Sequence, residues 1–269
     1  MYCPKLFSIL VLALVSSVTL AAETDAAKPK LATGIAVSAC LDTINREVAP
    51  DPQRCPGFVV ESLKSASQTC REASGTLTAG PEQAIWELDV NGDGQQEMTF
   101  ALEGNVTCEN AFSIFSCGSL GCPTPLYQQQ NGEWREIGGL DAATMESVSV
   151  VSTSPGQYGT LRVSCSSTDC VETWYYLWTG NAYEKSYVEV RGHRVNFANS
   201  IHGLYTLVTI TRLLSIPEGG ANFIARYPGD TEVAIVGTSE KGDYYYVSPC
   251  NACESGFVEK SAVRPVTAR

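Results

Sequence analysis

Positive charge is scarce in this chain. It carries 18 Lys and Arg residues against 29 Asp and Glu residues, which gives a formal net charge of −11 over 269 residues. Proteins that bind nucleic acid or anionic lipid neutralise phosphate groups with Lys and Arg side chains. The composition therefore argues against both partner classes. A cationic partner stays open, although an acidic surface also serves solubility alone.

Catalytic signatures are scarce as well. The only histidines are His193 and His202, and neither stands in a His-Glu-x-x-His metal motif. The sequence also lacks a Gly-x-Ser-x-Gly nucleophile elbow and a Gly-rich phosphate loop. A pair of carboxylates that meets only in space stays open, as in glycoside hydrolases. The sequence thus predicts a protein that is not an enzyme, with a hydrolase built from distant acids as an alternative.

Long apolar runs are absent after the first 21 residues. Lys5 precedes the apolar run Leu6 to Leu20, and small residues around Ala21 complete the pattern of a signal peptide. The run is short for a membrane span, although an uncleaved anchor is the alternative. We expect a signal peptide over 1–21, a flexible leader over 22–34, and a periplasmic or secreted protein without a transmembrane segment.

Cysteine, in contrast, is plentiful. Eleven are present, and removal of the signal peptide with Cys3 leaves ten. An even number in an exported chain predicts a disulfide framework, whose connectivity cannot be deduced from sequence. Close spacing favours local pairs, and zinc binding or redox activity at the last pair is the alternative. These expected pairs are Cys117 with Cys122, Cys165 with Cys170, and Cys250 with Cys253, which leaves Cys40, Cys55, Cys70 and Cys108.

Residues 35–73 have the spacing of two helices. Apolar residues recur three and four positions apart on either side of a Cys55-Pro56-Gly57 break. We expect a helical hairpin that caps the following sheet, with its cysteines facing inward or at the turn. The apolar positions are Val37, Cys40, Leu41, Ile44 and Val48, then Val59, Leu63, Ala66 and Cys70.

From about residue 83 the hydrophobic period changes to two, which predicts strands. Turn signals such as Asn131-Gly132 separate the apolar runs. The expected fold class is α+β, mainly β, with a disulfide-stapled antiparallel β domain over 83–200. Its strands are expected at Ala84 to Leu88, Met98 to Leu102, Leu126 to Gln129, Trp134 to Ile137, Val148 to Ser152, Leu161 to Cys165, Val171 to Trp178 and Tyr183 to Val190.

An acidic loop lies between two of these strands, with the sequence Asp-Val-Asn-Gly-Asp-Gly-Gln-Gln-Glu over 89–97. Calcium takes six to eight oxygen ligands. Asp89, Asn91 and Asp93 can supply side-chain oxygens, Gln95 its carbonyl, and Glu97 a carboxylate directly or through water. The spacing predicts a structural Ca²⁺ site. A metal-free Asn-Gly-Asp-Gly turn is the alternative.

The loop is not an EF-hand, because its twelfth position is Phe100 where an EF-hand has Glu. It resembles the strand–loop–strand calcium loops of FG-GAP and related extracellular repeats, which follow an Asp-x-Asp-x-Asp-Gly-x-x-Asp pattern. Asn91 and Glu97 depart from that pattern, and both keep an oxygen ligand. The resemblance covers nine residues and implies bound Ca²⁺, weakened by the charge that Asn91 removes.

The C-terminal segment resembles a bacterial SH3-like domain over 207–266. The resemblance is carried by Leu213-Leu214, Ile216 to Gly220, Phe223 to Ala225, Pro228 to Gly237, Tyr244 to Val247, and Ser255 to Val263. Tyr244 stands where Trp is usual, and an insert with Cys250 and Cys253 lengthens the last turn.

This resemblance implies a small β-barrel over 207–269. Relatives often bind cell-wall peptides or proteins through an aromatic-lined groove. Tyr227, Tyr244, Tyr246 and Phe257 are the residues expected to line it. The alternative is that these rings fill the barrel core.

Together these features predict an exported, non-enzymatic binding protein whose SH3-like module docks a cell-wall peptide or a protein partner. One alternative is an inhibitor or immunity protein that neutralises an exported toxin or hydrolase, because an acidic surface suits a basic enzyme. A cell-wall or glycan hydrolase is the other.

Overall fold

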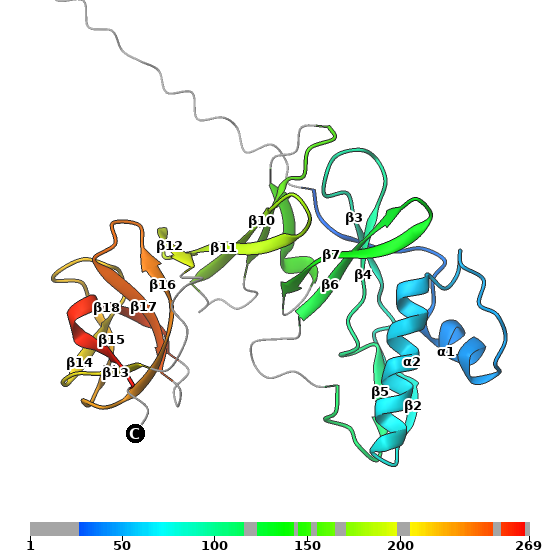
Figure 1. The fold of residues 1–269 in the computed structure, drawn as a ribbon, viewed down its shortest axis with the longest axis horizontal. Coiled ribbons are helices and arrows are strands. Elements are labelled where there is room, and N and C mark those ends of the chain that lie inside the picture. Colours follow the sequence, from blue (N-terminus) through cyan, green and yellow to red (C-terminus); the bar gives the residue numbers. More distant parts are fainter. Residues whose placement is uncertain are drawn as a thin grey trace, which may run out of the picture.

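The computed structural model describes residues 27–115, 123–142, 145–151, 155–164, 171–197, 205–249 and 254–266. These residues form two α-helices and many short strands, which confirms the predicted mainly β, α+β class (Figure 1). The helices are α1 (Val37–Asn45) and α2 (Gly57–Glu72), and the 3₁₀ turns are η1 (Met145–Ser147) and η2 (Lys260–Ala262).

The strands fall into two groups along the chain. The first group is β1 (Lys30–Leu31), β2 (Thr76–Ala79), β3 (Trp86–Leu88), β4 (Glu97–Thr99), β5 (Val106–Glu109), β6 (Pro123–Gln130), β7 (Glu133–Asp141), β8 (Val148–Val151), β9 (Thr160–Ser164), β10 (Glu172–Trp178), β11 (Tyr183–Val190) and β12 (His193–Phe197). The second group is β13 (Tyr205–Leu207), β14 (Thr211–Leu214), β15 (Phe223–Tyr227), β16 (Glu232–Ser239), β17 (Tyr244–Pro249), β18 (Gly256–Glu259) and β19 (Val263–Pro265).

The two helices lie where the 3.6-residue period places them. Helix α2 begins directly after Pro56, whose ring fixes the backbone for a helix start. Its apolar face is buried, and Phe58 stacks on Tyr127 of β6 with ring centroids 4.3 Å apart. Helix α2 therefore packs against the β6–β7 hairpin, and α1 packs against α2. A helical hairpin that caps the whole sheet stays a prediction.

A small sheet beside α2 was not predicted. Strands β2 and β5 pair with each other alone among the described strands, with Leu77 opposite Cys108. The Cys70–Cys108 disulfide ties β5 to the last turn of α2. Gly75 lets the chain pass close to this crosslink, because a Cβ there would lie 2.5 Å from the Cys108 sulfur. The sheet is thus built around a covalent bridge.

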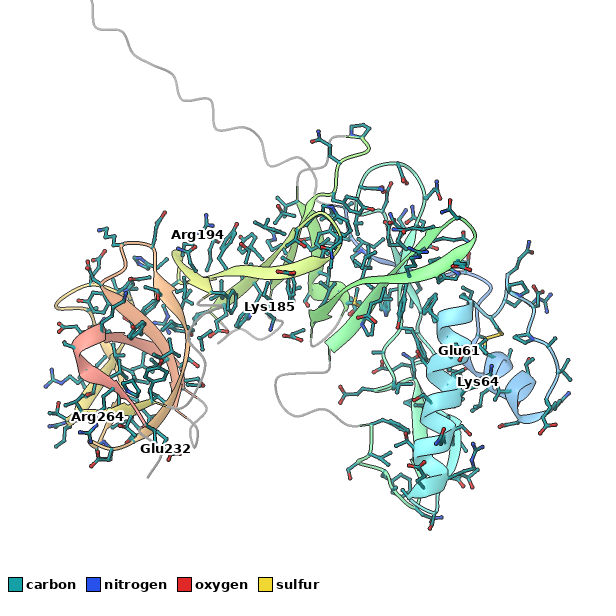
Figure 2. The ribbon with its side chains drawn as sticks, in the orientation of Figure 1. Glu61, Lys64, Lys185, Arg194, Glu232 and Arg264 are labelled. Carbon is teal, nitrogen blue, oxygen red and sulfur yellow. A yellow bond between two sulfur atoms is a disulfide. The ribbon has the colours of Figure 1, made fainter. Side chains whose placement is uncertain are left out.

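The middle of the molecule is a set of antiparallel hairpins. Strands β3, β4, β6 and β7 follow one another, and β8 to β12 form a second run. The runs meet at a parallel bridge between Gly138 and Tyr183. Beside it, Lys185 of β11 forms an ion pair with Asp141 of β7 and lies 4.8 Å from the Trp174 ring centroid (Figure 2).

The C-terminal strands continue this arrangement instead of standing apart. Residues Val195 to Phe197 of β12 pair with Gly237 to Ser239 of β16 (Figure 1). One cluster of buried residues is shared by the middle strands β11 and β12 and the C-terminal strands β17 and β18. Its members are Val188, Val190, Val195, Tyr246 and Phe257. His193 is the first residue of β12, the strand that makes this pairing.

The C-terminal strands run in the order β19, β13, β16, β17, β18, β14 and β15. Strand β13 begins at Tyr205, just before the predicted boundary at 207. Among the described residues the pairings leave β15 and β19 at the two ends of this array. Closure into an SH3-like barrel therefore stays a prediction.

Candidate functional site

The acidic loop is held by hydrogen bonds from its own main chain. Asp89 accepts from the N–H groups of Gly92 at 2.7 Å and Gly94 at 3.0 Å. Asn91 accepts from the N–H of Asp93 at 3.1 Å, and Asp93 accepts from that of Gln95 at 2.7 Å. These side chains impose successive tight turns between β3 and β4.

Glu97 leaves the loop and enters the interior. Its side chain is 1% exposed, and its two carboxylate oxygens accept from the N–H of Val90 and the amide of Gln128, each at 2.9 Å. Burial raises the pKa of the Glu97 carboxyl, against the lowering effect of these two hydrogen bonds. Glu97 is therefore committed to protein donors, in contrast to the exposed Asp93 and Gln95.

The loop oxygens are compatible with a cation, because each carboxylate oxygen has a further lone pair. Among the described residues, no group of three or more His, Cys, Asp or Glu side chains is placed to hold a metal ion. The predicted calcium set includes the Asn91 amide and the Gln95 carbonyl, which are outside such a group. Calcium binding to Asp89, Asn91, Asp93, Gln95 and Glu97 stays a prediction.

Calcium is expected to raise the melting temperature of the wild-type protein, and Asp89→Ala is expected to abolish the rise. At a Ca²⁺ concentration 100-fold above Kd, mass action adds about 2.7 kcal/mol to the free energy of unfolding. The matched control is Asp51→Ala, which also removes a turn hydrogen bond, the 3.0 Å bond from the N–H of Gln53. Thermal melting that is identical in chelator and in millimolar Ca²⁺ would contradict the site.

The four aromatic residues predicted to bind a ligand divide into two pairs. Tyr246 and Phe257 are only 2% and 0% exposed, and their ring centroids lie 4.9 Å apart in the shared core cluster. The Tyr246 hydroxyl donates to Glu172 of β10. These two rings fill the interior of the molecule and do not face solvent. Tyr227 and Tyr244 are half-buried and keep some exposed surface.

Tyr227 is the last residue of β15. Its hydroxyl donates to the Glu254 carboxylate at 2.8 Å. In the β14–β15 pairing Arg212 stands directly opposite Arg226. The Arg212 guanidinium lies 5.3 Å from the ring centroid of Phe223, a ring that is 57% exposed. The pairing of the two arginines could not be predicted from sequence, because only the strand register brings residues 14 positions apart together.

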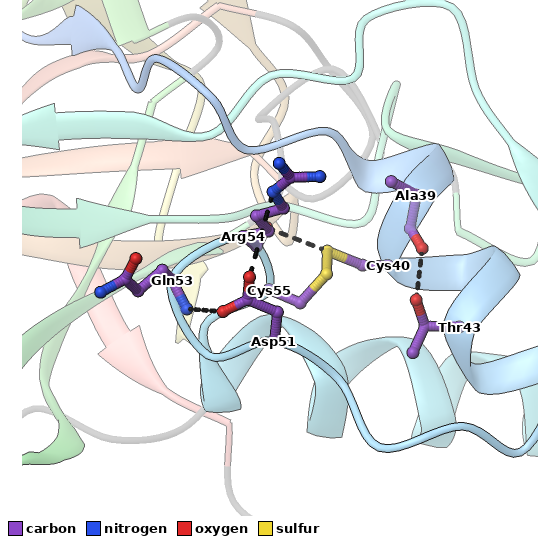
Figure 3. Close-up of a disulfide and its surroundings, with 7 residues drawn as sticks. All are labelled: Ala39, Cys40, Thr43, Asp51, Gln53, Arg54 and Cys55. Carbon is purple, nitrogen blue, oxygen red and sulfur yellow. Dashed lines mark hydrogen bonds and ion pairs between the residues drawn. A yellow bond between two sulfur atoms is a disulfide. The ribbon is translucent and has the colours of Figure 1, made fainter.

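Two disulfides are present among the described residues, which confirms a crosslinked chain. Cys40 joins Cys55 beside α1, where Asp51 and Arg54 shape the loop (Figure 3), and Cys70 joins Cys108. The pairs predicted within 117–122, 165–170 and 250–253 lie outside the described residues, as does His202. No helix among the described residues has the length and apolarity to cross a membrane.

Comparisons of the chain with protein-family models, with curated proteins and with solved structures find no match. A function is therefore inferred from the chain's own geometry.

Proposed function

We propose that this is an exported, non-enzymatic binding protein, and that its C-terminal strands dock an extended, carboxylate-bearing peptide of the cell wall or of a protein partner. The observation that carries the proposal is the exposed arginine pair on β14 and β15. Export is supported by the N-terminal pattern and by the two disulfides, since such crosslinks persist in oxidising compartments.

Strand β15 offers a main-chain edge to a partner. Among the described residues it pairs only with β14. Phe223 and Ile224 of this strand are 57% and 36% exposed. An exposed, apolar edge strand binds extended peptides by adding them to the sheet. The backbone of the bound peptide is therefore expected to pair with β15.

The arginine pair supplies charge complementarity. Like charges directly opposite each other in a sheet cost about 0.2 to 1 kcal/mol. No ion pair joins Arg212 or Arg226 to an acidic side chain among the described residues, although the chain as a whole carries −11. An anionic partner relieves the repulsion between the two arginines, and guanidinium groups bind carboxylates in a bidentate geometry. The peptide should therefore carry a carboxylate.

The proposal predicts that the full mature chain is retained on purified peptidoglycan at low salt, and that Arg212→Glu/Arg226→Glu lowers retention about tenfold or more by converting attraction into repulsion. Co-sedimentation measures retention. The whole chain is required, because β12 and Glu172 lie outside the 207–269 segment and contact its strands.

The matched control is Arg46→Glu/Arg54→Glu, which changes net charge equally at exposed positions beside α1. The control variant should be retained like the wild type. Equal retention of the Arg212→Glu/Arg226→Glu variant, or no retention of the wild type, would refute docking at β15.

A further inference from the structure

A groove of about 560 Å³ lies beside the acidic loop. All of its lining residues precede the C-terminal strands in the sequence. The loop forms one side of it and the end of β6 forms another. The residues that matter most are Asp93, Glu97, Gln128, Gln130, Trp134 and Tyr158. We infer that this groove is a binding site for a neutral saccharide, and the inference does not depend on peptide docking at β15.

The floor of the groove is a fixed polar network. The Tyr158 hydroxyl donates to the Gln128 amide oxygen at 2.7 Å, and the Gln130 amide donates to the same oxygen at 2.9 Å. Gln128 in turn donates to the buried Glu97 carboxylate at 2.9 Å. Because each polar group is already held in place, a ligand meets a surface that needs little rearrangement.

Two aromatic rings are held rigidly at the groove. Tyr158 stacks on Trp178 with ring centroids 3.8 Å apart. Trp134 packs edge-on against Phe58 of α2, with ring centroids 5.1 Å apart. Both rings are half-buried and both line the groove. Such rings offer flat apolar area, which suits the C–H face of a sugar ring.

The remaining lining matches hydroxyl groups. Gln95, Gln96 and Gln129 also line the groove. An amide both donates and accepts hydrogen bonds, as a sugar hydroxyl does. Aromatic surface next to convergent amides and carboxylates is therefore the donor set of a saccharide site.

The charge of the groove argues against anionic ligands. Glu87, Asp93 and Glu97 line the groove, and no Lys or Arg in the described part of the chain does so. Anionic ligands are therefore repelled. The Glu97 and Asp93 oxygens already accept hydrogen bonds from N–H groups, namely those of Val90, Gln128, Asn91 and Gln95. These oxygens are thereby fixed as acceptors, and it is the amides and aromatic rings beside them that favour a neutral polyol as the ligand.

The test titrates the full mature protein with linear tetramers of β-1,4-linked N-acetylglucosamine, β-1,4-linked glucose and α-1,4-linked glucose, with spermine as a cationic comparison. Calorimetry and Trp fluorescence report binding. We expect saturable binding of at least one tetramer below about 10 mM. The Gln95→Ala/Gln129→Ala variant, altered at two exposed lining residues, should bind about tenfold more weakly.

Two comparisons make the result specific. Gln53→Ala/Gln68→Ala, at exposed glutamines of the helical hairpin, should bind like the wild type. Arg212→Glu/Arg226→Glu should also do so, which separates this site from peptide docking. The inference is overturned if no tetramer binds, if Gln95→Ala/Gln129→Ala binds unchanged, or if spermine alone binds.

Discussion

Replacing both cysteines of the Cys70–Cys108 bridge by alanine is expected to lower the free energy of unfolding by about 4 kcal/mol. The bridge closes a segment with a sequence separation of 38 residues. Without it the unfolded chain gains the conformational freedom that the crosslink had removed. Both sulfurs are fully buried, so the alanine variant also leaves empty volume in the core.

The Cys40–Cys55 bridge provides an internal comparison. Its sequence separation is 15 residues, so the same entropy argument predicts a smaller loss of about 3 kcal/mol for Cys40→Ala/Cys55→Ala. Urea titrations of the wild type and both variants, followed by circular dichroism, measure the two losses. The expected order is wild type, then Cys40→Ala/Cys55→Ala, then Cys70→Ala/Cys108→Ala.

The relative stability of the two cysteine variants is the result that tests the loop-length argument. Equal stability of wild type and Cys70→Ala/Cys108→Ala would show that this crosslink does not hold the helices on the β2–β5 sheet. A reversed order would show that local packing outweighs loop length in this part of the molecule. Melting temperatures should follow the same sequence, at about 2 to 4 °C per kcal/mol for a chain of this size.

Much of the secondary structure could be predicted from sequence because its signals are local. The helical spacing of Leu63, Ala66 and Cys70 requires only that one face of α2 be buried. The Asn131-Gly132 turn joins β6 and β7, and both residues have positive φ, as such a tight hairpin turn demands. The acidic loop was found in the same way, since its turn-forming oxygens lie within nine residues.

Features that depend on long-range pairing could not be predicted. The β2–β5 sheet consists of two short strands that period two does not reveal, and Cys108 anchors it only once its partner is known. The groove beside the acidic loop brings Gln128 together with Tyr158 and Glu97, residues about 30 positions apart. The burial of Tyr246 follows from β10, since Glu172 covers the hydroxyl of a ring expected to face a ligand.

Gly237→Ala is expected to destabilise the junction between the middle strands and the C-terminal strands by about 1 to 3 kcal/mol through overpacking. A Cβ at this position would lie 2.4 Å from the main-chain oxygen of Asn196 and 2.7 Å from a methyl carbon of Val195. The oxygen belongs to the backbone and cannot rotate away. Strands β12 and β16 must therefore move apart to admit the methyl group.

The matched control is Gly139→Ala in β7. Gly139 is also a strand glycine, but a Cβ there would meet no atom within 4 Å. This control should stay within about 0.5 kcal/mol of the wild type. Chemical unfolding measures both variants, and amide hydrogen exchange at Val195 to Phe197 reports the junction directly.

The methyl group added by Gly237→Ala also tests which contacts hold the C-terminal strands to the middle strands. Phe197, opposite Gly237, stacks on Trp174 with ring centroids 5.2 Å apart, so separation of β12 from β16 also disturbs β10. Hydrogen exchange should therefore quicken in β12 and β16 of Gly237→Ala, and not in α2. Unchanged exchange and stability would mean that the shared core cluster, and not the strand pairing, joins the two parts of the chain.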